Sequence, residues 1–273
     1  MIASDAQLDL FSAAGAKRSV AEPPAATAPP VAVDALDDTI LVAAIPGAGL
    51  ADASRLTAEA ARRHLTAAVP ALERLCQRFA GFGLAHPVPE QVAALEALAE
   101  IGGPEAVEAV VRIIIKGVAQ DPTVGTAITA AARLGASLPA DTVLPLLRHS
   151  DPRVRAEACR CARFRPDIAA VLSDLLHDLH QEAADQAACA LGRMGQTEAR
   201  PFLLRLLRDV PTAEAIDAIA DIADEETVVL LGRIARSGAD LAEAARNALA
   251  IIDHPLAIRL RDALGKAQPA DTA

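Results

Sequence analysis

A repeat of about thirty residues runs through most of this chain and constrains its fold more than any other feature. Six segments end in an apolar residue that has small or apolar residues three and seven positions before it, with one exception. Positions three and seven apart lie on one face of an α-helix, so each segment predicts a helix with one buried face. Seven positions before the end stands alanine in every segment except one, which has Glu157. The six terminal residues are Ile101, Leu134, Phe164, Met194, Ile222 and Ile252, with successive differences of 33, 30, 30, 28 and 30.

A second, more leucine-rich helix is predicted between successive members of this series. Apolar residues gather in 143–147, 171–176, 202–207 and 228–234, and proline-containing turns separate the segments. Proline fits in the first turn of a helix and ends the helix before it. Hydrophobic residues are 52% of the chain but include only five Phe and no Trp or Tyr, so small and branched aliphatic side chains must fill the core. The pattern predicts an all-α, right-handed α-solenoid of stacked helix pairs.

One unit resembles a HEAT repeat of the short, bilin-lyase-like kind. Residues 144–158 read LPLLRHSDPRVRAEA. The marks of that family are an apolar first helix, then Asp-Pro, then Val-Arg leading an alanine-rich second helix. Neighbouring units keep the periodicity and lose this signature, and the resemblance covers roughly residues 90–265. It implies HEAT-like helix pairs but no single function, because the family includes scaffolds, lyases and repair enzymes.

The chain divides into four predicted parts. Residues 1–33 form a disordered tail with a Pro/Ala linker, because four prolines within residues 23–30 forbid a helix and favour an extended tether. Residues 34–90 form an irregular helical N-terminal cap, which a solenoid needs at its end. Residues 91–268 hold the HEAT-like repeats, and residues 269–273 are a short tail.

The predicted tail contains one short motif, Gln7-Leu8-Asp9-Leu10-Phe11. It resembles the linear motif by which bacterial polymerases and repair proteins dock on the DNA sliding clamp, in the order Gln, Leu, Ser or Asp, Leu, Phe. The resemblance implies that Gln7 hydrogen-bonds at the rim of a pocket that Leu10 and Phe11 fill. Each apolar anchor would contribute roughly 1.5–3 kcal/mol on burial. The alternative is a plain tail, or a short amphipathic segment that folds back onto the first helices.

Arginines cluster around the unit that carries the Asp-Pro mark. Within residues 148–163, only Asp151 and Glu157 are acidic. Arginine pairs well with carboxylates, so one hypothesis is a patch for an acidic partner, with phosphate as a less favoured ligand. The alternative is ordinary helix-surface charge whose side-chain stems cover leucines. The patch residues are Arg148, Arg153, Arg155, Arg160 and Arg163, with Arg165 beside them.

Composition and motifs argue against direct nucleic-acid binding, membrane insertion and catalysis. The formal net charge of −10 opposes broad contact with a phosphate backbone, and no run of about twenty apolar residues is present. A DNA glycosylase needs aromatic residues to stack an extruded base, and Trp and Tyr are absent. None of the six histidines precedes Glu, as HEAT-type binuclear metal sites require, and His177 and His180 lack a partner motif. We predict no catalytic residue, no metal and no cofactor.

The cysteines and the N-terminus favour a cytoplasmic protein. Four cysteines in a long chain without a recognisable secretory signal indicate reduced core thiols rather than a disulfide framework. They are Cys76, Cys159, Cys161 and Cys189.

Taken together, these features predict a non-enzymatic, bacterial, protein-binding scaffold or adaptor. Residues 7–11 would dock on the sliding clamp, and the concave face of the solenoid would hold another protein. The alternative is a HEAT-like chaperone or assembly factor without clamp contact. A lyase or a DNA glycosylase is a third interpretation, with generic repeat similarity as its only support.

Overall fold

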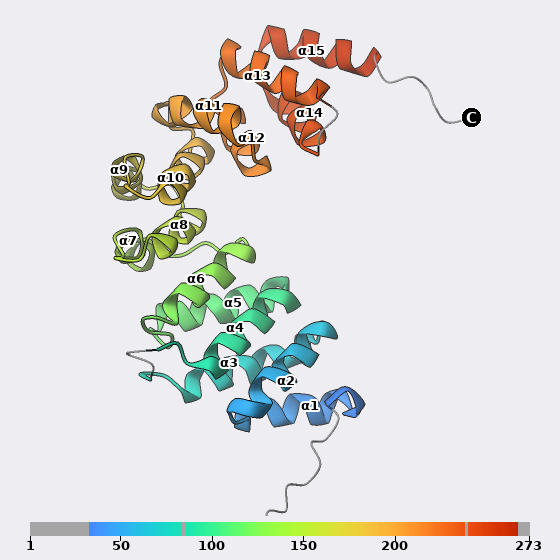
Figure 1. Ribbon diagram of the computed structural model, residues 1–273, viewed down its shortest axis with the longest axis vertical. Helices are drawn as coiled ribbons and strands as arrows, with labels where there is room; N and C mark the ends of the chain where they lie inside the picture. The colour runs from blue at the N-terminus through green and yellow to red at the C-terminus, as the bar shows by residue number, and fades with distance from the viewer. Residues whose placement is uncertain (1–32, 83–85, 238–239, 267–273) are drawn as a thin grey trace, which may run out of the picture.

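The computed structural model describes residues 33–82, 86–237 and 240–266, and every regular element in these ranges is a helix. Helix pairs stack into a curved array that runs from α1 at one end to α15 at the other (Figure 1). The prediction of an all-α solenoid of HEAT-like helix pairs is therefore confirmed. The α-helices are α1 (Asp38–Ala44), α2 (Leu50–Arg62), α3 (Val69–Arg78), α4 (Pro89–Ile101), α5 (Gly103–Ile115), α6 (Val124–Arg133), α7 (Ala140–Leu147), α8 (Pro152–Cys161), α9 (Pro166–Leu175), α10 (Gln181–Arg193), α11 (Arg200–Asp209), α12 (Ala213–Ala220), α13 (Glu225–Arg236), α14 (Ala242–Ile251) and α15 (Pro255–Lys266). Short 3-10 helices are η1 (Val33–Ala35), η2 (Ile45–Gly47), η3 (Thr66–Ala68) and η4 (Thr197–Ala199).

The helices form two rows that differ in how closely their members pack. Each even-numbered helix from α2 to α14 packs on the next even-numbered helix. In the odd-numbered row, α9 makes few contacts with α11, and α11 makes few with α13. Because the even row is packed more closely, the stack curves toward it. Figure 1 shows α8, α10 and α12 on the inner side of the curve and α7, α9 and α11 on the outer side.

Small side chains allow the close packing of the inner row. Each inner helix from α4 to α14 has a fully buried alanine at a corresponding position. At Gly192 in α10, even an added Cβ would lie 2.4 Å from the carbonyl oxygen of Ala218 in α12. The sequence therefore sets the approach of the inner helices through residues with little or no side chain. The alanines are Ala94, Ala127, Ala158, Ala187, Ala215 and Ala245.

The structure corrects the predicted repeat register in one unit. The spacing predicts Phe164 as the buried last residue of an inner helix, but α8 ends at Cys161 and Phe164 is 56% exposed. The helix ends early because Pro166 starts α9 and Ala162 already has extended backbone angles. The buried alanine of this unit is consequently Ala158, and Glu157, the apparent exception, lies next to that position.

The first three α-helices extend both rows at the N-terminal end. Helix α2 packs on α4, and α3 packs on α5. Arg63, which follows α2, holds the start of the described chain. Its guanidinium donates to Glu59 at 2.6 Å, to Asp38 at 2.7 Å and to the carbonyl oxygen of Asp34 at 2.9 Å. Hydrogen bonds from Arg62 and Arg63 lower the pKa of Glu59 to about 2.

The cysteines are free and buried, as predicted. Burial raises the pKa of the Cys76, Cys161 and Cys189 thiols to about 12, so these groups stay protonated at neutral pH. They act as small apolar side chains of the core. Within the described ranges, no helix is both long enough and apolar enough to cross a membrane.

Candidate functional site

The tail motif and the arginine patch fall on different parts of the chain. Residues Gln7, Leu8, Asp9, Leu10 and Phe11 lie outside the described residues. The patch arginines lie on α8 and in the turns beside it, at the middle of the inner row. The site is therefore built from α8 and its neighbours α6, α10 and α12.

Arg155, near the start of α8, holds two units together. Its guanidinium donates two hydrogen bonds of 2.8 Å to the carboxylate of Asp178, in the turn between α9 and α10. It also donates to the carbonyl oxygens of His149 at 2.8 Å and Ser150 at 3.1 Å. The two ion-paired side chains are 14% and 7% exposed, respectively. The hydrogen bond from Arg155 lowers the pKa of Asp178, which also accepts from the backbone N–H of His180. Arg155 thus stabilises the packing of two successive units.

Arg160, near the end of α8, belongs to a network that crosses three inner helices. It pairs with Glu157 one turn earlier and with Glu214 of α12, both at 3.2 Å. The other carboxylate oxygen of Glu214 accepts from Arg193 of α10 at 3.1 Å. Gln186 of α10 joins the network by accepting from Arg160 and donating to Glu214, each at 3.1 Å. One carboxylate is thus shared by two arginines from successive units.

An arginine-lined pocket opens beside this network, where α6, α8 and α10 end. Its volume is about 340 Å³, and we call it the arginine pocket. Arg163 donates a hydrogen bond to the hydroxyl of Ser137 at its edge. No carboxylate is present among the described residues that line it. The lining residues are Gly135, Ala136, Ser137, Arg160, Ala162, Arg163, Phe164, Ala190, Arg193 and Met194.

The remaining patch arginines lie elsewhere. Arg153, at the start of α8, lines a separate hollow of about 350 Å³ that Glu96, Arg133 and Asp151 also line. Arg148 is exposed at the end of α7. Of the five predicted residues, Arg160 and Arg163 line the arginine pocket, Arg153 lines another hollow, and Arg155 is held in an ion pair.

Two of the carboxylates that contact the patch arginines come from distant parts of the sequence and are not the sequence neighbours Asp151 and Glu157. In the folded chain Asp178 reaches Arg155 and Glu214 reaches Arg160, from 23 and 54 residues away. These carboxylates belong to later units, which stacking brings alongside α8. Spacing within a single unit gives no information about them.

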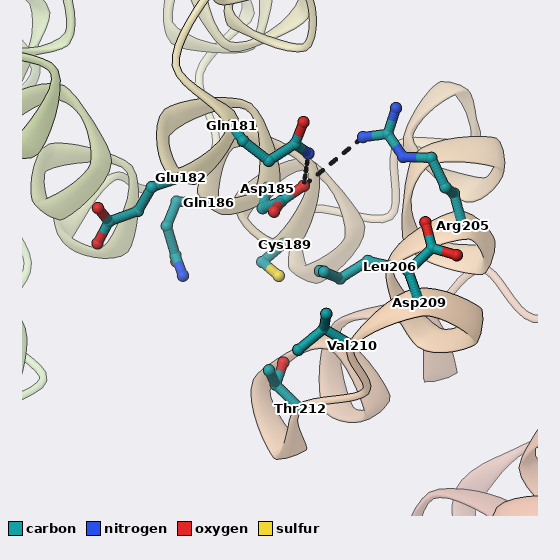
Figure 2. A pocket seen from close by; sticks show the side chains of 10 residues that line it. All are labelled: Gln181, Glu182, Asp185, Gln186, Cys189, Arg205, Leu206, Asp209, Val210 and Thr212. Carbon is teal, nitrogen blue, oxygen red and sulfur yellow. Dashed lines mark hydrogen bonds and ion pairs between the residues drawn. The ribbon is translucent and has the colours of Figure 1, made fainter.

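A larger hollow, of about 540 Å³, lies between α10, the second half of α11 and the turn from α11 to α12 (Figure 2). Figure 2 shows Cys189 and Leu206 facing its middle, with Val210 along one side. Asp185 accepts from the amide of Gln181 at 2.6 Å and pairs with Arg205 at 3.6 Å. We call this hollow the acid-rimmed groove, because Glu182 and Asp209 add exposed carboxylates to its lining. The other lining residues are Gln186 and Thr212.

The chemistry of these hollows suits the binding of side chains. Apolar floors with charged edges are typical of the centre and rim of a protein interface. Within the described ranges, no group of three or more His, Cys, Asp or Glu residues could hold a metal ion. The ring of His177 packs edge-on against Phe202, with 5.5 Å between the ring centroids, and His180 lies 3.5 Å from Asp178.

Sequence reasoning missed three residues of this surface, and a local signal existed for two of them. Pro166 disfavours helical backbone at Arg165, the residue before it, which indicates that the inner helix ends near Phe164. Arg193 lies in the last turn of α10, where a cation is favoured by the helix dipole. Glu214 carries no such signal, because its role depends on α8 and α10 from other units.

Comparison with known protein families supports the repeat assignment. Residues 140–214 match the family model for HEAT repeats, and residues 90–114 match the model for PBS lyase HEAT-like repeats. The first match runs from α7 into α12, and it includes the acid-rimmed groove and most of the arginine pocket. No curated protein matches the chain.

Proposed function

We propose that this chain is a non-enzymatic protein-binding adaptor of the bacterial cytoplasm, and that the inner face from α8 to α12 holds a partner protein. HEAT repeats generally mediate protein interactions, which supports the scaffold role. The observation that carries the proposal is the acid-rimmed groove, which joins an apolar floor at Leu206 to exposed carboxylates. Val210, at its side, is 64% exposed and would be covered by a partner.

Site-specific photo-crosslinking tests the inner face. A photoreactive amino acid replaces Val210, and the same group replaces Ala170, which is exposed on the outer helix α9, as the matched control. We expect a discrete protein adduct in native cells from position 210 and none from position 170. An Asp209→Arg change beside the crosslinker should remove the adduct. Equal adducts from both positions, or none from 210, contradict the proposal.

The finer part of the proposal is that residues 7–11 dock on the bacterial DNA sliding clamp. The pentapeptide Gln7-Leu8-Asp9-Leu10-Phe11 supports it, because it meets every position of the clamp-binding motif. The proline-containing segment at 23–30 would let a partner reach it. Burial of Leu10 and Phe11, offset in part by ordering of the segment, gives a dissociation constant on the order of micromolar.

Direct titration tests the clamp contact. Purified bacterial sliding clamp is titrated with the full chain, with the full chain carrying Leu10→Ala and Phe11→Ala, and with a Ser12→Ala control outside the motif. We expect micromolar binding of the wild type and the control, lost in the double variant with no change in thermal stability. A labelled peptide of residues 1–18 should bind alone. If the full chain and the peptide both fail, while the crosslink at Val210 remains, the chaperone or assembly-factor alternative is favoured.

A further inference from the structure

We infer that the arginine pocket binds a side-chain carboxylate from an acidic segment of a partner protein, with an apolar neighbour of that carboxylate packed against Phe164. The inference rests on the proposed scaffold function and names the chemistry of one contact on the inner face. Its basis is that three arginines and one exposed aromatic residue line the same pocket.

The charge of the pocket calls for a carboxylate. Arg160, Arg163 and Arg193 line it, and none of its described lining residues is acidic. Glu214 provides an internal example of the ligand, because its two oxygens contact Arg160 at 3.2 Å and Arg193 at 3.1 Å. Within the described residues, Arg163 makes a hydrogen bond only to the Ser137 hydroxyl, through its Nε. Its two terminal nitrogens are therefore available to a second carboxylate.

The apolar part of the pocket calls for a neighbour beside that carboxylate. Phe164 lies in the linker between α8 and α9 and is 56% exposed. Met194, at the end of α10, is half-buried and lines the same pocket. A pocket lined by Phe, Met and Arg has the composition of a protein interface, where these residue types are enriched.

A single protein carboxylate fits this surface better than a nucleic-acid backbone. The chain has a formal net charge of −10, and Glu157 and Glu214 pair with the pocket arginine Arg160. A continuous polyanion would meet these carboxylates on leaving the pocket, and like charges repel. One carboxylate followed by an apolar side chain avoids them.

The methionines of the chain provide the test. Methionine occurs only at positions 1 and 194, so ¹³C-methyl-methionine labelling of the full chain reports on the pocket through one signal. The probe is the blocked peptide acetyl-Ala-Leu-Glu-Phe-Ala-amide. Three further ligands distinguish sources of the anion: the same peptide with Gln for Glu, acetyl-Ala-Leu-Phe with a free C-terminal carboxylate, and inorganic phosphate. Arg163→Gln is the test variant, and Arg148→Gln, an exposed arginine outside the pocket, is its matched control.

We expect the Glu peptide to shift the Met194 signal saturably and to leave Met1 in place. The Gln peptide should bind about tenfold more weakly, and Arg163→Gln should weaken the Glu peptide by about three- to tenfold, as for partly exposed charged contacts. Arg148→Gln should have no effect.

Several results would overturn the inference. These are no saturable shift of Met194 up to about 10 mM peptide, equal binding of the Glu and Gln peptides, or binding of phosphate or of the free C-terminal carboxylate as tight as that of the Glu peptide. The Val210 crosslink and the clamp titration do not use this pocket. A silent Met194 signal beside a positive crosslink therefore removes the pocket assignment and leaves the scaffold function intact.

Discussion

At the start of α8, Arg155 directs its donors to Asp178 and two backbone carbonyl oxygens, whereas at the end of α8 Arg163 reaches only the hydroxyl of Ser137 within the described residues. The two arginines lie eight positions apart in one unit, and the sequence around them gives no reason to treat them differently. What separates them is the neighbour that stacking supplies. Asp178 is 7% exposed and lies against Arg155, but none of the described residues that line the pocket at Arg163 is acidic.

This difference shows how a solenoid assigns roles to surface charge. Each unit presents its helix ends to the next unit, so a charge at one end is used inside the fold when the next turn carries its counter-ion. A charge without such a counter-ion among the described residues, as at Arg163, stays open. A segment rich in arginine is therefore not by itself evidence of a binding patch. Arginines that pair with carboxylates of the same chain must first be left out.

The largest expected effect on stability comes from Arg155, at the start of α8. Arg155→Ala leaves the carboxylate of Asp178 buried without its partner, and breaking a buried pair in this way costs about 3 kcal/mol. We expect a lower urea midpoint and a lower Tm. Arg153→Ala, two residues away and exposed, is the matched control and should change stability by less than about 0.5 kcal/mol. Equal effects of the two changes would mean that Arg155 does not hold the units together.

The second-largest effect is expected from Gly192→Ala, which disturbs the network beside the arginine pocket without changing any charge. In Gly192→Ala the new Cβ would lie 2.4 Å from the carbonyl oxygen of Ala218 and 2.8 Å from a methyl group of Leu203. Backbone cannot yield as a side chain does, so α12 must move, and Glu214 moves with it away from Arg160 and Arg193. We expect a loss of about 1–3 kcal/mol, measured by urea unfolding, with a shifted Met194 methyl signal.

Gly125→Ala is the control for this change. It also lies within an inner helix, α6, but its added Cβ would meet only a Val154 methyl group at 3.7 Å, which is ordinary contact. This variant should be neutral or up to about 1 kcal/mol more stable, because alanine is the better helix former. If both glycine variants lose the same stability, close approach of α10 and α12 is not the cause.

Much of the fold could be predicted from the sequence because it rests on local signals. Asp151 accepts a hydrogen bond from the backbone N–H of Arg153 and starts α8 at Pro152, where the Asp-Pro mark places it. The periodicity likewise located the buried alanines of five inner helices. The predicted register of α8 is wrong because the periodicity does not continue through the linker that holds Phe164. The counter-ions of Arg155 and Arg160 could not be predicted for another reason, since they depend on how consecutive units stack.

Acidification should change the contributions of Asp178 and Glu157 to the stability of the fold in opposite directions. Arg155 lowers the pKa of Asp178 below its ordinary value of 3.8, so this group stabilises the fold above that value, and the contribution is lost as pH falls through the folded pKa. Desolvation raises the pKa of Glu157 above its ordinary 4.5, so its charge destabilises the fold at neutral pH. That penalty disappears as pH falls from the folded pKa to below 4.5.

Two neutral variants measure these opposite contributions. At pH 7, Asp178→Asn should lower stability, and Glu157→Gln should raise it by less than about 1 kcal/mol. Urea midpoints between about pH 3 and 7 should show the difference from wild type shrinking on acidification in both cases, at lower pH for Asp178→Asn. A Glu157→Gln variant that is less stable at pH 7 would show that the ion pair with Arg160 outweighs desolvation.

The smallest expected effect on stability is the one that decides whether the pocket end is open. Arg163 is exposed, so Arg163→Gln should change the free energy of unfolding by less than about 0.5 kcal/mol. The same change should weaken binding of the Glu peptide, whereas Arg155→Ala should act mainly on stability. A loss above about 1 kcal/mol from Arg163→Gln would place Arg163 in the same structural class as Arg155. The contrast between the two ends of α8 depends on these variants acting on different quantities, and urea unfolding and Met194 titration of the same samples measure both.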